Sequence, residues 1–347
     1  MAGLGVAAAM VVTEFTEVGV NIIMKAAMTR GMNQFVYIVY SNALAIFILL
    51  PSCFIFYRKR PLPQLTASIL FKIFLLGVCS CSIQMLMNTG IKYSSPTLST
   101  AMTDLVPAFT FLLAVISRME KLELRLRSSQ AKTMGTVLSV AGALFVTLYK
   151  GQPITNSSLH QSLRLLHYSN WVVGGILCAA GALCISVLYI IQTWIFKVYP
   201  SELMITFICC FYVTVLSATI SLIAERDPNV WILKPDLELI AIVCSAVFAV
   251  SLRSVVHTWA CGKKGPVYTA MFKPLGMIIA TLLGVSFLGD TLYLGSVIGG
   301  IIIALGFYTV MWGKAQEEKK MGEEEENSDL GSSSHKAPLL QNRSVDV

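Results

Sequence analysis

Long apolar segments constrain this 347-residue chain more than any other feature. A helix that crosses a bilayer needs about 20 mostly apolar residues. Segments of that kind recur along the sequence, separated by short polar links such as residues 58–61 and 262–266. Only 13% of the residues are charged, whereas a soluble domain uses about 25%. The sequence therefore predicts an all-α, polytopic membrane protein whose surface contacts the lipid bilayer.

The apolar segments predict about ten spans and a simple division of the chain. The spans are expected at residues 6–28, 34–56, 69–90, 97–117, 133–149, 171–195, 202–224, 239–260, 267–288 and 292–312. A polar connector at 151–170 and a charged, Ser-rich tail at 314–347 are too polar to span, and we expect the tail to be disordered. The connector then separates a five-helix half at 1–150 from a second five-helix half at 171–313.

The loops between the spans predict the orientation of the chain. Lys and Arg gather in the loops on one side, for example at residues 58–60 and 263–264. The positive-inside rule places these loops, and with them both termini, in the cytoplasm. The connector is then outside the cytoplasm, where Asn156 begins a glycosylation sequon close to the membrane. The sequence leaves open whether Asn156 is glycosylated.

A weak internal repeat relates the two halves. The tripeptide at residues 100–102 recurs at 269–271, each time in the penultimate span of a half. Each half also ends in a Gly-rich span. Because each half has an odd number of spans, the two halves must insert with opposite orientation. Inverted repeats are typical of secondary transporters, which bind substrate near the bilayer midplane where the repeats meet.

Charged residues inside the predicted spans are the first functional candidates. Each is unfavourable by at least about 2.5–3.5 kcal/mol at a helix centre, so it should face the bundle interior and have a partner. A charge near a span end can instead reach the interface, which is the alternative for Lys25 and Arg253. Three acidic and three basic residues balance, which suits a zwitterion or a near-neutral solute better than a polyphosphate. These residues are Glu14, Glu17, Lys25, Asp104, Arg253 and Lys273.

Helical spacing groups other polar residues with these charges. Glu14, Glu17, Asn21 and Lys25 share one face of the first span. Gln84 and Asn88 share a face of the third span, and Ser186, Tyr189 and Gln192 share a face of the sixth. Such stripes line either a water-filled passage or a hydrogen-bonded helix interface, and both interpretations stay open.

The repeat suggests a sharper hypothesis for Asp104 and Lys273. They occupy matching positions in the repeat, on the same faces as Thr100 and Thr269, close to Pro107 and Pro274. Proline distorts a helix, and irregular backbone at membrane depth is tolerated where it lines a cavity. Asp104 and Lys273 would face a central cavity from opposite halves and attract an ammonium and a carboxylate. Helical rise separates them by roughly 10 Å in depth, so they could instead act as outer and inner gates.

We therefore select two sets of candidate residues. The candidate substrate-binding residues are Glu17, Asn21, Gln84, Asn88, Thr100, Asp104, Tyr189, Gln192 and Lys273. The candidate proton-binding or gating residues are Glu14, Asp104, Arg253 and His257.

Other function classes lack a matching pattern. No paired aspartates, His-rich motif or zinc-ligand spacing indicates an intramembrane enzyme, and we expect no cofactor or metal. The nine cysteines read as small buried apolar residues. No clustered basic face indicates nucleic-acid binding. A receptor or scaffold remains an alternative class, and the oligomeric state is open.

Five stretches of the sequence resemble a known family. They are residues 21–31 (NIIMKAAMTRG), 93–111 (YSSPTLSTAMTDLVPAFTF), 142–151 (GALFVTLYKG), 192–200 (QTWIFKVYP) and 263–275 (KKGPVYTAMFKPL). On these, the chain resembles the plant nodulin-like EamA transporters, also called walls-are-thin-related or Usually Multiple Acids Move In and Out Transporters, of the drug/metabolite transporter superfamily. The resemblance covers about residues 6–313.

The resemblance implies ten helices in two inverted EamA repeats and a secondary transporter, either a facilitator or proton-linked. It implies amino acids as substrates, with auxin or another organic anion or metabolite as the alternative. It also implies the plasma membrane or the vacuolar membrane, and we favour the plasma membrane. The chain departs from the family pattern at Asp104, where an Asn is expected.

Overall fold

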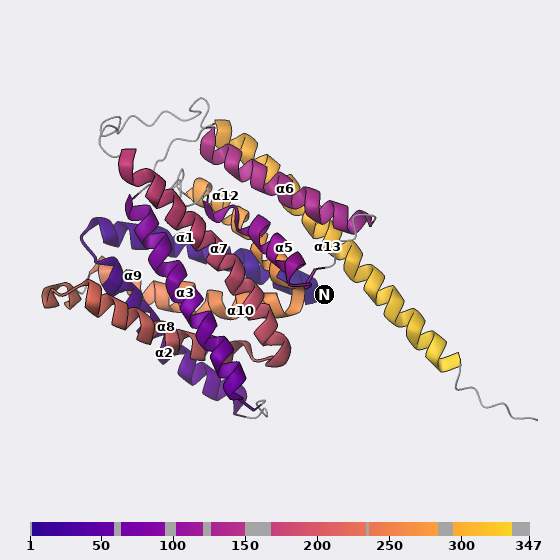
Figure 1. Cartoon of the computed structure of the whole chain (residues 1–347), viewed down its shortest axis with the longest axis horizontal. Helices are drawn as coiled ribbons and strands as arrows, with labels where there is room; N and C mark the ends of the chain where they lie inside the picture. The colour runs from indigo at the N-terminus through magenta and orange to yellow at the C-terminus, as the bar shows by residue number, and fades with distance from the viewer. Residues whose placement is uncertain are drawn as a thin grey trace, which may run out of the picture.

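The protein is entirely helical in the parts that its computed structural model describes, which are residues 2–58, 64–93, 102–120, 126–149, 168–233, 236–283 and 294–334. Figure 1 shows the helices as one elongated bundle. The helices are α1 (Ala2–Thr29), α2 (Gln34–Tyr57), α3 (Ala67–Tyr93), α5 (Val106–Ile116), α6 (Arg127–Leu148), α7 (Tyr168–Val198), α8 (Glu202–Ala224), the 3-10 helix η1 (Pro228–Trp231), α9 (Leu237–Cys244), the π-helix η2 (Ser245–Leu252), α10 (Arg253–Lys264), α11 (Pro266–Ala270), α12 (Lys273–Leu283) and α13 (Leu294–Ser334).

The lengths and surfaces of these helices confirm a polytopic membrane protein. Seven of the described helical segments are long and apolar enough to cross a bilayer, and Val106–Ile116 is a shorter apolar helix. Large apolar side chains stand on the outside, such as Phe47, Ile55 and Ile116, which are 72%, 75% and 75% exposed. An exposed apolar surface of this extent is what a lipid-facing belt requires.

The fourth and ninth predicted spans are both broken. The turn at Asp104 and Leu105 lies just before Pro107, and the turn at residues 271–272 lies just before Pro274. Proline lacks an N–H and its ring clashes with the preceding helical turn, so each chain restarts as a new helix, α5 or α12. The two breaks match when the prolines are aligned. In that alignment Asp104 corresponds to Met271, two residues from the match with Lys273 that the tripeptide repeat suggested.

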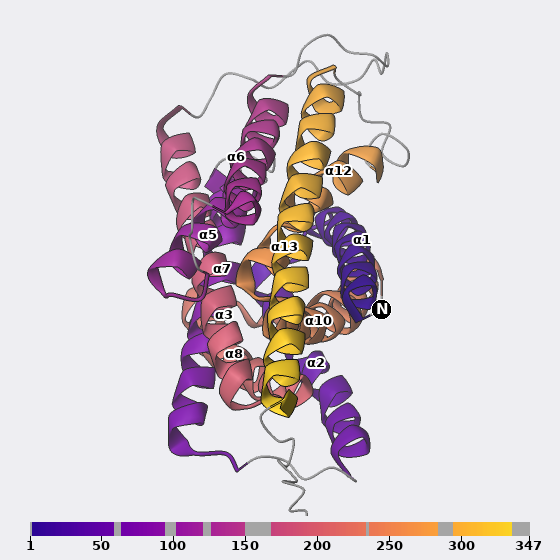
Figure 2. The ribbon, with the colours of Figure 1, turned by 90° about the vertical axis from the view of Figure 1, so that its right-hand side faces the viewer.

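The Gly-rich last spans of the two halves, α6 and α13, pack along each other (Figures 1 and 2). A Cβ added to Gly306 would lie 2.5 Å from the backbone nitrogen of Ser139, and one added to Gly135 would lie 2.7 Å from the carbonyl oxygen of Gly306. Side chains cannot fit at such distances, so glycine is needed for the two backbones to meet. We call this contact the glycine seam.

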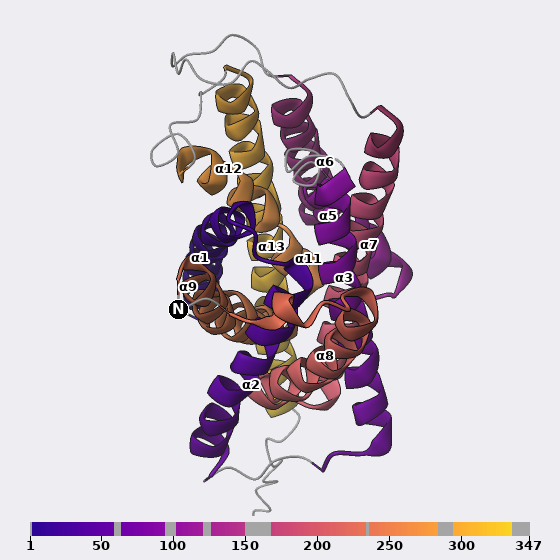
Figure 3. The same ribbon diagram turned by 90° about the vertical axis from the view of Figure 1, so that its left-hand side faces the viewer.

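The other contacts between helices follow the order of the helices within each half. The second helices of the two halves, α2 and α8, pack together, as do the last helices. The first helix of each half packs on the third span of the other: α7 on α3, and α1 on α9, η2 and α10 (Figure 3). This is the pattern expected of two halves related by an approximate two-fold axis.

Two features differ from the sequence-based expectation. The helix α13 continues to Ser334, past the boundary expected at residue 313, so the charged tail begins as a helix. Lys and Glu are good helix formers, and Lys314 and Glu317 are held by ion pairs. The π-helix η2 within the eighth span was not expected. Residues 151–167 of the connector, which include Asn156, and residues 335–347 lie outside the described residues, whereas 168–170 already belong to α7.

Candidate functional site

Five ionisable side chains from three helices meet in the middle of the bundle. Glu14 and Glu17 come from α1, Arg253 and His257 from α10, and Lys273 from α12. The Nζ atom of Lys273 lies 2.8 Å from Oε2 of Glu17 and 3.2 Å from Oε1 of Glu14. Nη1 of Arg253 lies 3.1 Å from Oε1 of Glu17. We call these five residues the central cluster.

Local structure explains how these groups approach one another. Glu14 and Glu17 lie three residues apart and therefore share a face of α1. Lys273 is the first residue of α12, and Gly276 follows it by less than one turn. A Cβ on Gly276 would lie 2.8 Å from Oε2 of Glu14, so this glycine makes room for the carboxylate.

The π-helix η2 sets the direction of the α10 side chains. It ends immediately before Arg253, whose Nε donates to the carbonyl oxygen of Ala249 at 2.9 Å. A π-helical turn holds more residues than an α-helical turn, so it rotates everything that follows, and such segments are frequent at functional sites. In this chain the rotated register places Arg253 and His257 beside α1.

The cluster is buried and balanced in charge. The side chains of Glu14 and Lys273 are 3% and 8% exposed. Two carboxylates face two permanently cationic groups, so the cluster is neutral when His257 is neutral. Buried ion pairs contribute little net stability because desolvation offsets their attraction. Four charges at membrane depth therefore indicate a functional role.

The side chain of His257 extends the cluster to α7. Its Nδ1 lies 3.3 Å from the hydroxyl of Tyr189, and its Nε2 lies 3.9 Å from Oε1 of Glu14 without a hydrogen-bond partner. Glu14, Glu17 and His257 place oxygen and nitrogen atoms within 4.8 Å of one another, as around a cation. The ammonium group of Lys273 supplies that positive charge.

Other candidate residues join helices to each other. Gln192 donates to the hydroxyl of Thr258, which links α7 to α10. Asn42 donates to Oε1 of Gln84 at 3.2 Å, which links α2 to α3. For Gln192 and Gln84 the structure thus shows the hydrogen-bonded interface that was one of the two interpretations.

The remaining candidates differ in their placement. Asn88 is half-buried on α3, on the same face as Gln84, and Asn21 is exposed on the polar face of α1. Neither hydrogen-bonds to the central cluster in the described part of the chain. Thr100 and the side chain of Lys25 lie outside the described residues.

The sequence predicted that Asp104 and Lys273 face one cavity from opposite halves, and the structure gives the two residues different surroundings. Lys273 binds Glu14 and Glu17, and no ion pair joins it to Asp104 among the described residues. Asp104 is 2% exposed in the turn before α5, and its Oδ2 has no hydrogen-bond partner. Helical spacing placed Glu14 and Glu17 on one face of α1, but the sequence could not show which helix that face contacts.

Two layers of buried apolar side chains pack next to the central cluster, which they meet at Tyr189. The first layer joins α5 to α7, α10 and α11 through Val106, Ala182, Tyr189, Cys261 and Ala270. The second layer joins α5 to α11 through Phe111, Ala114 and Val267. All of these side chains are at most 9% exposed. We call the two layers together the apolar plug.

A second group of charges lies beyond the plug, at the end of α5. Lys132 places Nζ 2.8 Å from Oε2 of Glu120 and 2.9 Å from Oε2 of Glu317, and Lys314 bonds to the other oxygen of Glu120. Burial would raise the pKa of Glu120, but the ammonium groups of Lys314 and Lys132 outweigh it and hold that pKa below its usual range. Sequence reasoning missed this ion network because its members flank spans and read as ordinary interfacial charges.

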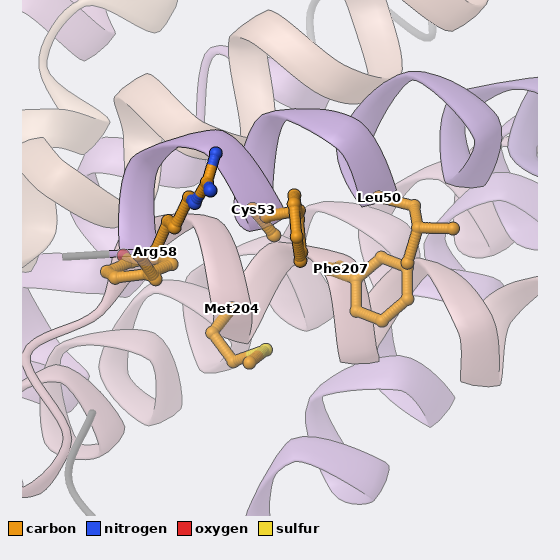
Figure 4. Close-up of a pocket in the computed structure, with 7 residues that line it drawn as sticks. Leu50, Cys53, Arg58, Met204 and Phe207 are labelled. Carbon is orange, nitrogen blue, oxygen red and sulfur yellow. The ribbon is translucent and has the colours of Figure 1, made fainter. Parts of the chain in front are cut away.

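The pocket in Figure 4 is separate from these sites. It is a groove of about 360 Å³ between α2 and α8, bounded by Leu50, Cys53, Met204 and Phe207 among others. Its lining is almost entirely apolar, and Leu50 is 52% exposed on the outer surface. A groove of this kind contacts lipid tails, and it offers few polar groups for a hydrophilic solute.

Comparison with known proteins gives consistent matches. A model described as the EamA-like transporter family matches residues 4–148. The chain is 45% identical to WAT1-related protein At3g28050 of Arabidopsis thaliana, over 96% of this chain and 94% of the relative. It is 46% identical to WAT1-related protein At5g40210 of Arabidopsis thaliana, over 96% and 95%. A crystal structure with 15% identity matches with a TM-score of 0.66 over 90% of this chain and 99% of the other, and so shares the fold.

Proposed function

Since the chain belongs to the WAT1-related group of EamA-like transporters, we propose that it carries zwitterionic amino acids across a membrane and binds them at the central cluster. The family makes it a transporter and not an enzyme, and it implies two EamA repeats. The observation that supports the substrate class is the buried, charge-balanced set of Glu14, Glu17, Arg253 and Lys273.

A zwitterion is the ligand that such a set can exchange for its internal ion pairs. The substrate carboxylate would replace Glu14 or Glu17 beside Lys273 and Arg253, while its ammonium takes the freed carboxylate. Every charge then keeps a partner, which matters because an unpaired buried charge is unfavourable by several kcal/mol. A simple amine or a simple anion would leave one sign uncompensated.

Exposure along α1 indicates the route to the cluster. On the face of this helix that carries Glu14, Val6 and Met10 are 2% and 0% exposed, the side chain of Glu17 is 19% exposed, and Asn21 is exposed. A solute would therefore reach the cluster from the Asn21 end. We take the apolar plug to be the closure of the other end, which would make this arrangement one state of an alternating-access cycle.

We propose the same orientation that the loop charges predict. Both termini face the cytoplasm, and the Asn21 end opens to the opposite side. The plug and the ion network of Glu120 then form the closed cytoplasmic end. We favour the plasma membrane over the vacuolar membrane as the site of action.

Counterflow into liposomes tests the proposal. Full-length protein is reconstituted, the liposomes are loaded with unlabelled amino acid, and entry of labelled neutral, acidic and basic amino acids and of indole-3-acetate is measured. We expect neutral zwitterions to exchange fastest, and Lys273→Gln to abolish exchange. Lys263→Gln removes an exposed lysine of α10 as the matched control. No flux of any solute, preference for indole-3-acetate, or unchanged exchange by Lys273→Gln would overturn the assignment.

A further inference from the structure

We propose that Asp104 is a proton-binding site, separate from the central cluster, which takes up and releases one proton in each transport cycle. The inference rests on the proposed function, since it concerns what travels with the substrate. It starts from an isolated carboxyl group in the interior of the bundle.

The side chain of Asp104 is buried and unsupported. It is 2% exposed, its Oδ2 has no hydrogen-bond partner, and it forms no ion pair with the described residues. It stands in the turn before α5, one residue before the N-cap residue Leu105. Its Oδ2 atom is therefore buried without a donor that would stabilise a negative charge.

Magnitudes show that this carboxyl needs a cation. Leaving one charge of a buried pair uncompensated is unfavourable by about 3–5 kcal/mol. The positive end of a helix dipole returns at most about 2 kcal/mol in favourable geometry. The dipole is too weak to stabilise a bare carboxylate here. A proton is the cation that we assign to this site, because Oδ2 is buried and no described side chain offers it a charge.

Among the described residues, the groups packed around this segment supply no positive charge. Tyr189 and Cys261 belong to the apolar layer that contains Val106, two residues after Asp104, and Tyr268 lies on α11, which packs on α5. These are weak acids that carry no positive charge. Lys273 on α12 is paired with Glu14 and Glu17, and Lys132 on α6 is paired with Glu120.

The break in the helix gives the proton a way in and out. The turn at Asp104 interrupts the helical ladder, and the hydroxyl of Ser186 on α7 donates to the carbonyl oxygen of Val106 at 3.2 Å. When the plug opens, α5 and α7 separate at this point and water reaches Asp104. The carboxyl then gives its proton to water as H₃O⁺ and becomes a carboxylate. On the other side the carboxylate takes one proton from H₃O⁺, which becomes water, before the group is enclosed again.

Proton flux measured together with substrate flux tests this site. Liposomes containing full-length protein trap a pH-sensitive dye, and a gradient of the best exchanged amino acid drives transport. We expect wild type to move protons with the substrate. In Asp104→Asn we expect the proton flux to fall to that of protein-free liposomes while amino-acid counterflow persists. Asp227→Asn replaces an exposed aspartate that caps η1, where Asn caps equally well, and should keep both fluxes.

Each result has a distinct meaning. Wild type that exchanges amino acids without proton flux, or Asp104→Asn that retains proton flux, overturns this inference and leaves the proposed function intact. Loss of counterflow by folded Asp104→Asn would instead mark Asp104 as a substrate ligand and also overturns it. Wild type without any solute flux overturns the proposed function itself. Infrared spectra give a readout independent of transport: the carbonyl band of a protonated carboxyl should be present at neutral pH and absent in Asp104→Asn.

Discussion

Lys273 holds the central cluster together, because its ammonium group contacts both carboxylates of α1. The two carboxylates depend on it unequally. Glu17 has a second partner in Arg253, whereas Glu14 has no other ion pair with a permanently charged group among the described residues. Loss of the lysine would therefore leave Glu14, and not Glu17, as the unpaired charge. This asymmetry lets a double substitution distinguish the two.

Lys273→Met should destabilise the protein by about 3–5 kcal/mol, because it strands a buried carboxylate. Adding Glu14→Gln should recover most of the loss, since the pair of Glu17 and Arg253 stays complete. Adding Glu17→Gln should not, because Glu14 and Arg253 then both lack a partner. Thermal unfolding in detergent measures the order of the three variants. Equal stability of the two double variants would contradict the pairing seen here.

At the scale of helices, the glycine seam and the two proline breaks should have opposite effects on how freely the helices can move. The seam brings the backbones of α6 and α13 into direct contact, so these helices form a fixed pair. The breaks before α5 and α12 divide the fourth and ninth spans, so these spans can bend. Movement during transport should therefore concentrate in α5, α11 and α12, close to the cluster and the plug.

Gly306→Ala should reduce stability by about 1–3 kcal/mol, because the added methyl group would overlap the backbone of Ser139. Gly300→Ala on the same helix provides the matched control, since no atom lies within 4 Å of its added Cβ. That control should be neutral or gain up to about 1 kcal/mol from better helix propensity. The unfolding temperatures of the two variants measure this difference. If Gly300→Ala lost as much stability as Gly306→Ala, the result would argue against the seam.

At the scale of the whole molecule, the carboxylate of Glu120 joins the helices at the end of the bundle that we propose is closed. Glu120 follows α5, which carries one side of the plug, and its partners Lys132 and Lys314 sit on α6 and α13. Glu120 thus links α5, which we expect to move, to the pair of α6 and α13, which we expect to stay together. A Cβ on Gly265, in the turn before α11, would also lie 3.9 Å from this carboxylate. The ion network therefore lies next to α5 and next to the turn before α11, the two helices that form the second layer of the plug.

The stabilising effect of Glu120 should depend on pH. Its pKa is held below the usual range of a carboxyl group, so its ion pairs stabilise the fold above that range. The contribution is lost as the pH falls through the lowered pKa, where Glu120 becomes protonated. Unfolding temperatures of wild type and Glu120→Gln should differ at neutral pH and converge in acid. A difference that persists or grows in acid would contradict the lowered pKa.

The sequence predicted the positions of the spans better than the contacts between them. Apolar length placed the helices, and helical spacing put Glu14 and Glu17 on one face, because both depend on a single helix. Which helix that face meets depends on packing between distant segments, so the contacts with Arg253 and Lys273 could not be predicted. The tripeptide repeat matches Asp104 with Lys273, whereas the proline breaks match it with Met271, because the prolines fix where the helices are interrupted.

The π-helix η2 has a consequence for comparing this chain with its relatives. Removing one residue from Ser245–Leu252 would turn α10 by about 100° about its axis. The guanidinium of Arg253 would then point away from Glu17, although every charged residue is still present in the sequence. A one-residue gap here would thus be equivalent to losing the arginine. In an alignment, the number of residues between α9 and α10 is as informative as the identity of the residues themselves.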